Sequence, residues 1–213
     1  MRTMSAYNFT YIDCPLITYQ DLNFEQSIIS QYPDIIISSK YLAKKLPFAN
    51  TKKNIWVVGE ESAKILKDKN YLIKYIANNF AQLLKALPKT SYPNMMYLSG
   101  DQITKETPKE IRRLIIYQVK YTSFLTEAQV QSIKNGIDYV LLYSYNSAKT
   151  FLKIVKTYDL LKFLENSIII AISLKVAEIL KPYFAHIIHC KEGEHQQIKG
   201  LLLNDQSYLR RKR

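Results

Sequence analysis

The stretch "DYVLLYSYNSAKTF", Asp138 to Phe151, has the pattern of a buried β-strand that ends in hydroxyl and amide side chains before a helix begins. Ser144 and Asn146 stand where the first free backbone N–H groups of a helix need partners, so helix capping is one interpretation. The same N–H groups and hydroxyls also suit a carboxylate or phosphate, so anion binding is another. The stretch alone predicts a strand followed by a helix and leaves both interpretations open.

Short apolar runs alternate with helical stretches along the chain, which favours an α/β fold with parallel sheets. "TPKE" (Thr107–Glu110) and "TEAQ" (Thr126–Gln129) each combine a capping Thr with Glu or Gln three residues later, so each predicts a helix start. Gly136 is placed to end the second of these helices. The strands that we expect are residues 34–37, 55–58, 95–98, 138–142, 168–172 and 185–188.

The two halves of the chain repeat one plan. "DIIISSKYLAKKL" from Asp34 matches the stretch from Asp138: an acidic residue, an apolar strand, hydroxyls and a helix. "VVGEESAKILKDKNY" and "IAISLKVAEILKPYF" align with one constant offset and without gaps. The offset pairs Gly59 with Ser173, Ala63 with Ala177, Leu66 with Leu180, Leu84 with Ile198, and Leu87 with Leu201. The repeat predicts two similar Rossmann-like or flavodoxin-like lobes.

Two extended segments lie where the lobes would join. "CPLITYQD" (Cys14–Asp21) and "IIYQVKYTSF" (Ile115–Phe124) are similar in character, and we expect them to pair as antiparallel strands. This pairing makes one lobe discontinuous. The predicted organisation is a lobe of residues 1–17 and 124–213, an inserted lobe of residues 22–116, and a connector strand of residues 117–123.

The composition is that of a basic globular protein. The 30 Lys and Arg residues outnumber the 18 Asp and Glu residues, and the net charge of +12 favours a polyanionic partner. Only four of these charges lie in the tail Arg210–Arg213. No apolar run is long enough for a membrane span, and no signal peptide opens the chain, so we expect a cytoplasmic protein that does not bind membranes.

The cysteines and histidines do not indicate a fold that is stabilised by disulfides or by a metal. Cys14 and Cys190 are too few for a disulfide framework. His186, His189 and Cys190 match none of the usual zinc spacings, and three-residue spacing on a strand turns the two histidines to opposite faces. We therefore expect no metal site.

The order of these motifs resembles the uroporphyrinogen-III synthases, a family of two similar α/β lobes joined by a two-stranded connector. Their strand–Thr-Ser–helix element is similar to "IIISSKYLAKKL" and "LLYSYNSAKTF", and their Gly-x-x-Thr-Ala turn to "VGEESA" and "ISLKVA". Their connector Tyr-Thr and a strand that ends in Gly are matched by "VKYT" and "MMYLSG". Family members open with a strand, an Arg-Pro turn and a helix before the segment matching "CPLITY". We therefore expect either a true start upstream of Met1 or a discontinuous lobe that lacks an N-terminal strand and helix.

The resemblance implies an enzyme, a hydro-lyase of haem and tetrapyrrole biosynthesis. The reaction closes linear hydroxymethylbilane to uroporphyrinogen III, with inversion of the last pyrrole ring and loss of water. The family needs no cofactor, and its substrate carries eight carboxylates. The expected partner is thus this small-molecule polycarboxylate, held in a cleft between the lobes by a monomer, and no nucleic acid is expected.

The resemblance also selects candidate residues. Tyr121 matches the connector Tyr, and a phenol there can act as a general acid toward the departing hydroxyl, or can simply pack on the sheet. The predicted substrate-binding residues follow strands or begin helices: Ser38, Ser39, Lys40, Ser62, Ser99, Gly100, Ser144, Tyr145, Asn146 and Ser173. Lys175 lies beside one of these turns.

Two other function classes stay open at this stage. The basic charge, the basic tail and 17 Tyr residues are also compatible with a nucleic-acid-binding α/β protein, although no recognised nucleic-acid motif accompanies them. A non-catalytic sensor with the same two lobes is the third interpretation.

Overall fold

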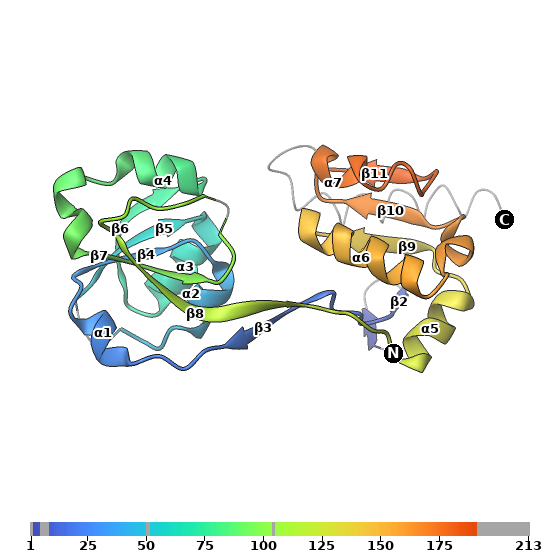
Figure 1. The fold of residues 1–213 in the computed structure, drawn as a ribbon, viewed down its shortest axis with the longest axis horizontal. Helices are drawn as coiled ribbons and strands as arrows, with labels where there is room; N and C mark the ends of the chain where they lie inside the picture. The colour runs from blue at the N-terminus through green and yellow to red at the C-terminus, as the bar shows by residue number, and fades with distance from the viewer. Residues whose placement is uncertain (1, 5–8, 50–51, 104, 191–213) are drawn as a thin grey trace. The chain divides into compact units, whose positions relative to one another are not determined.

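The computed structural model describes residues 2–4, 9–49, 52–103 and 105–190. They divide into two units (Figure 1): one consists of residues up to Thr18 and from Tyr121 onward, and the other of Tyr19–Lys120. Each unit contains a parallel sheet with helices, so the predicted two-lobed α/β fold is confirmed. Of the described helices, none is long and apolar enough to cross a bilayer.

The inserted unit, Tyr19–Lys120, is built on a six-stranded sheet of order β3-β8-β7-β4-β5-β6. Four predicted strands form as β4 (Asp34–Ile37), β5 (Asn54–Val58), β7 (Met95–Gly100) and β8 (Arg112–Tyr121). Sequence patterning missed β6 (Leu72–Ala77). The helices are α1 (Gln26–Ser30), α2 (Lys40–Lys45), α3 (Glu60–Asp68) and α4 (Phe80–Ala86), with a 3-10 turn η1 (Lys89–Asn94).

Both faces of this sheet are buried. Alternate residues of β4 point to opposite sides, so Ile35 and Ile37 pack with α2 and α3, through Leu42 and Leu66. Ile36 packs on the other side against α4 through Phe80 and Leu83. This double cover explains why the strands are apolar throughout instead of alternating.

Lysines hold the ends of two of these helices. The Lys69 ammonium donates to the carbonyl oxygens of Ala43, Lys44 and Leu46 at the end of α2. Lys53 does the same for α1, at Ile29, Ser30 and Tyr32. The last carbonyls of a helix lack hydrogen-bond donors within the helix, so the two lysines supply the missing donors at the ends of α1 and α2. Burial lowers the pKa of each lysine.

The discontinuous unit contains a three-stranded parallel sheet of order β11-β10-β9 and a two-stranded antiparallel sheet. Its strands are β1 (Arg2–Met4), β2 (Phe9–Tyr11), β9 (Tyr139–Leu142), β10 (Ile168–Ala171) and β11 (Ile187–His189). Its helices are α5 (Glu127–Lys134), α6 (Tyr145–Thr157) and α7 (Leu174–Glu178), with a 3-10 turn η2 (Leu161–Leu164).

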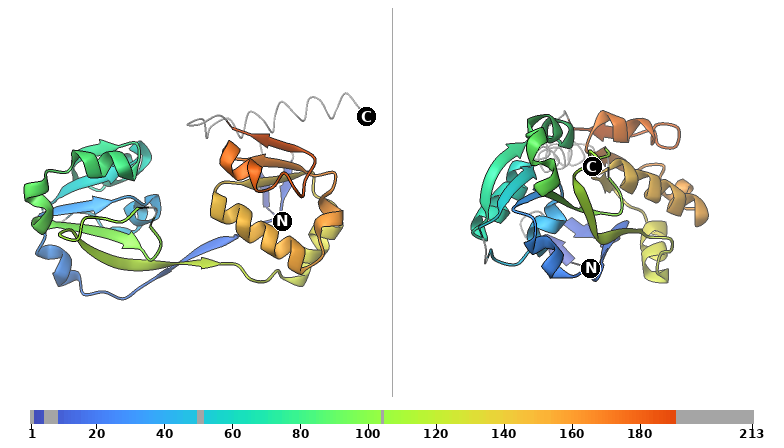
Figure 2. Two further views of the ribbon diagram at one scale, coloured as in Figure 1. Left: turned by 45° about the horizontal axis from the view of Figure 1, so that its top comes forward. Right: turned by 60° about the vertical axis from the view of Figure 1, so that its left-hand side comes forward.

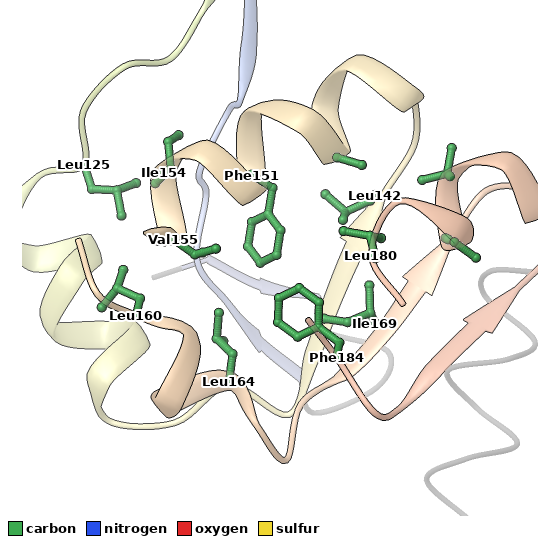
Figure 3. Packing of buried hydrophobic residues seen from close by; sticks show 14 residues of the cluster. Leu125, Leu142, Phe151, Ile154, Val155, Leu160, Leu164, Ile169, Leu180 and Phe184 are labelled. Carbon is green, nitrogen blue, oxygen red and sulfur yellow. The ribbon is translucent and has the colours of Figure 1, made fainter. Parts of the chain in front are cut away.

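The core of this unit lies between the sheet and helices α6 and α7. Figure 3 shows Phe151 of α6 beside Phe184, with Leu142 and Ile169 of the sheet nearby. The centroids of the two stacked rings are 5.9 Å apart. The repeat is visible in this packing, because Leu180 is fully buried here and its predicted equivalent Leu66 is fully buried in the inserted unit. Ile198 and Leu201, the remaining repeat positions, lie outside the described residues.

The chain passes between the units through β3 (Ile17–Asp21) and β8, neighbours in one sheet (Figure 2). The Leu22 amide donates to the Ile116 carbonyl, and the Thr122 amide donates to the Leu16 carbonyl. Residue numbers fall along one strand as they rise along the other, so the two strands are antiparallel. The expected two-stranded connector is therefore present.

Of the two predicted helix starts, one is confirmed and one is wrong. Thr126 and Gln129 form a reciprocal capping box at α5, and Gly136 follows that helix with φ of +98°. At Thr107–Glu110 there is only a turn, in which the Ile111 amide bonds the Pro108 carbonyl. β8 begins at Arg112, because pairing with β7 and burial of Ile111 outweigh the local capping signal.

Gly100 tests how tightly β7 and β8 pack. A Cβ atom added there would lie 2.5 Å from the Tyr117 ring, so Gly100→Ala should lower the free energy of unfolding by about 1–3 kcal/mol. Urea unfolding measures the loss. In the Tyr117→Leu background the same substitution should cost much less, and an equal cost in both backgrounds would show that this clash is not the cause.

Candidate functional site

The predicted binding residues of the inserted unit gather at one edge of its sheet. Ile37 of β4 lies in register with Val57 of β5 and Leu98 of β7, and all three strands are parallel. Their carboxyl ends therefore meet at one edge, which carries Ser38, Ser39, Ser99 and Gly100. In open α/β sheets, ligands bind at this edge where the strand order reverses. Here the chain runs from β4 outward to β5 and β6 and returns to β7 on the other side of β4.

The two serines after β4 have different roles. Ser39 caps α2, accepting a hydrogen bond from the Leu42 amide at 3.4 Å. The Ser38 hydroxyl instead lies 2.5 Å from the Tyr97 hydroxyl, at the reversal point itself. Burial raises the pKa of Tyr97, which is 3% exposed, so its phenol stays protonated. Ser38 and Tyr97 thus present a neutral pair of hydroxyls.

Ser99 and Gly100 shape this edge from within. Ser99 is buried, donates to the Gly100 carbonyl at 3.0 Å and accepts from Arg113 Nε at 2.8 Å. Gly100 is also buried and makes room for the Tyr117 ring. These contacts position the end of β7.

Helix α3 offers little to an anion. Glu60 and Glu61 occupy its first turn, where acidic side chains already complement the positive end of the helix dipole. Lys40 forms an exposed ion pair with Glu61, and Ser62 is buried within the helix. Lys40 is therefore paired with an acidic side chain, and Ser62 is enclosed by the packing of α3.

A second polar edge lies in the discontinuous unit. Leu142 of β9 is in register with Ala171 of β10, so Ser144 and Ser173 begin their helices at the same edge. Ser144 and Ser147 form a reciprocal capping box at α6, which confirms the capping interpretation of Ser144. Ser173 precedes α7 without a side-chain capping bond.

Tyr145 lies close to two cations at this edge. Lys149 Nζ is 5.8 Å and Lys175 Nζ is 5.3 Å from the centre of its ring, both within the range of cation–π attraction. The ring is partly exposed. Within the described part of the chain, neither lysine forms an ion pair, so this edge carries two uncompensated positive charges.

Tyr121 belongs to the same unit, at the end of the connector strand β8. Asn146, in the first turn of α6, donates to the Tyr121 hydroxyl at 3.0 Å. The structure thus brings together three of the predicted residues, Tyr121, Asn146 and their neighbour Tyr145.

Sequence reasoning missed Tyr97, Arg113 and Lys149 at these edges. Lys149 carried a usable signal, since it lies four residues after Tyr145 on one helix and so on the same face. Tyr97 and Arg113 carried none, because their positions depend on strand pairing. In the described residues no group of three or more His, Cys, Asp or Glu side chains is arranged to hold a metal ion.

Comparison with known proteins agrees with this architecture. No protein-family model matches the chain. It is 33% identical, over an alignment of 253 residues, to the uncharacterized protein RP474 of Rickettsia prowazekii, and the alignment covers 96% of this chain and 93% of that protein.

Two solved structures share the fold. Uroporphyrinogen-III synthetase from Helicobacter pylori superposes with a TM-score of 0.61 at 18% identity, covering 89% of this chain and 90% of that one. A mutant uroporphyrinogen III synthase from Thermus thermophilus gives 0.51 at 13% identity, covering 95% and 92%. The chain therefore belongs to the same family as protein RP474 of Rickettsia prowazekii, and its fold is that of the uroporphyrinogen-III synthases.

Proposed function

We propose that this protein is a uroporphyrinogen-III synthase, a hydro-lyase that closes hydroxymethylbilane with loss of water and inversion of the last pyrrole ring. One observation carries the proposal: in a chain with the synthase fold, the parallel sheets of both units end in polar, donor-rich edges. Such edges suit a substrate with eight carboxylates, and the net charge of +12 attracts an anion of this kind.

Different residues of the two edges have different proposed roles. In the discontinuous unit, Ser173, Tyr145 and Asn146 contact the substrate, while Lys149 and Lys175 attract its acid groups. In the inserted unit, Ser38 contacts substrate directly. Of the remaining predicted residues, Ser39, Lys40, Ser99, Gly100 and Ser144 hold the strand ends and helix starts in place through the contacts described above. Ser62 is buried within α3.

The proposed chemistry is mainly positioning. The hydroxymethyl end of the substrate ionises readily, so the protein has to hold a bent conformer that closes to isomer III before spontaneous closure to isomer I. Tyr121 is the proposed general acid, giving its proton to the departing hydroxyl so that water leaves. Asn146 orients the phenol through the hydrogen bond that it donates to the Tyr121 hydroxyl.

The product isomer tests the proposal. Purified protein is supplied with hydroxymethylbilane, the products are oxidised to porphyrins, and the isomers are separated by chromatography. We expect isomer III to predominate, in proportion to protein concentration, and heat-denatured protein to give isomer I. Isomer I alone from folded protein would refute the synthase proposal.

A further inference from the structure

Arg113 is a half-buried cation that has no acidic partner among the described residues. Its guanidinium donates from Nε to Ser99 Oγ at 2.8 Å, and from Nη2 to the carbonyl oxygens of Gly100 and Asp101 at 2.6 and 2.9 Å. All three acceptors are neutral. Across the described residues, Arg113 forms no ion pair and its Nη1 group has no hydrogen-bond partner.

The position of Arg113 places this charge at the reversal point of the inserted sheet. Arg113 on β8 is in register with Tyr97 on β7, and parallel neighbours in register point to the same face. The guanidinium is close enough to lower the pKa of Tyr97, although burial has the larger and opposite effect. The Tyr97 hydroxyl in turn bonds Ser38, which ends β4.

The acidic side chain directly after β7, Asp101, does not neutralise this site. The Asp101 carboxylate accepts hydrogen bonds from the Val119 and Gln102 amides, at 2.9 and 3.0 Å. Only its backbone carbonyl bonds Arg113. Since a guanidinium stays charged at any relevant pH, the edge keeps a fixed positive charge whose orientation is set by backbone acceptors.

We propose that Arg113, Ser38 and Tyr97 form a carboxylate-binding site at the reversal point between β4 and β7. The guanidinium supplies Nη1 donors and charge, and the Ser38–Tyr97 pair supplies the one O–H group that its mutual hydrogen bond leaves free. The inference deepens the proposed function. It rests on that function only for the identity of the natural ligand, which we propose is a carboxylate side chain of the substrate. Binding of a simple carboxylate needs no catalytic activity.

Succinate is the probe, and Arg112 provides a matched control. NMR titration of ¹⁵N-labelled protein should give saturable shifts of the Arg113 Nε–H signal and the Ser38 amide. Arg113→Met should weaken binding about tenfold or more, since a hydrogen bond to a charged group contributes about 1.5–3 kcal/mol. Arg112→Met removes the same charge from the adjacent, exposed position on the opposite face, and should change affinity less than twofold.

Two further variants protect the test from misfolding. Arg113→Met removes three hydrogen bonds and can unfold the unit, whereas Ser38→Ala and Tyr97→Phe leave the Arg113 contacts intact. Each should weaken succinate binding at least threefold. Equal affinity in a folded Arg113→Met variant and in Arg112→Met, or unchanged affinity in both hydroxyl variants, would overturn the site.

Phosphate distinguishes the chemical source of the anion. At about pH 8 phosphate and succinate are both dianions, so a tighter phosphate complex would overturn the carboxylate assignment. The outcomes also separate this site from the synthase proposal. Succinate binding that depends on Arg113, without formation of isomer III, would support the carboxylate site and refute the synthase proposal. Formation of isomer III without such binding would support the synthase proposal and refute the site.

Discussion

Replacing Tyr121 by Phe is expected to lower kcat for isomer III about a hundredfold, with little change in KM. The substitution removes the hydroxyl that accepts the Asn146 hydrogen bond and that we propose donates the proton to the leaving group. General acids typically contribute a hundredfold or more, which is about 2.7 kcal/mol of transition-state stabilisation. Steady-state kinetics with isomer analysis measures the change.

Tyr183→Phe is the control for this experiment. The Tyr183 ring is similarly exposed and lies 3.9 Å from Lys156 Nζ, away from the polar edge formed by α6 and α7 starts. Its loss of a hydroxyl should leave kcat within about twofold. A Tyr121→Phe variant that also stays within twofold would remove Tyr121 from the mechanism and leave positioning as the source of catalysis.

Leu66→Ala is expected to lower the free energy of unfolding of the inserted unit by about 2–5 kcal/mol, the range for a fully buried leucine that leaves a cavity. Leu180→Ala should have the same effect on the discontinuous unit. The two leucines belong to separate hydrophobic clusters. Hydrogen exchange should therefore show lost protection mainly in the unit that carries the substitution.

Leu174→Ala is the control, because it makes the same leucine-to-alanine change at an exposed position. Leu174 is 48% exposed in α7, so the same truncation should cost only about 0.5 kcal/mol. Equal loss of protection in both units after Leu66→Ala would contradict the view that each unit has its own core.

The features that sequence predicted best depend on local pattern. The apolar runs at Asp34–Ile37 and Ile168–Ala171 are buried on both faces, and such strands have few alternatives. Capping at Ser144 and Thr126 was also predictable, because the cap needs only residues within one turn. The order of these local units along the chain was enough to indicate the fold.

The features that sequence missed depend on neighbours distant along the chain. β6 begins with exposed Leu72 and Lys74 alternating with half-buried Ile73 and Tyr75, because it lies at the sheet edge. The helix expected at Thr107 fails because β8 pairs with β7 from Arg112 onward. The same pairing brings the Arg113 side chain within hydrogen-bond distance of Ser99, so no spacing within either strand could have predicted that contact.

The antiparallel pairing of β3 and β8 has a kinetic consequence. The discontinuous unit is interrupted by Tyr19–Lys120. If this insertion were unfolded, bringing its ends together would close a flexible loop of about 100 residues, at a cost of about 4 kcal/mol in chain entropy. Once the inserted unit has folded, its sheet holds residues 22 and 116 together. The two segments of the discontinuous unit are then already close to each other. We therefore expect the inserted unit to fold before the discontinuous unit.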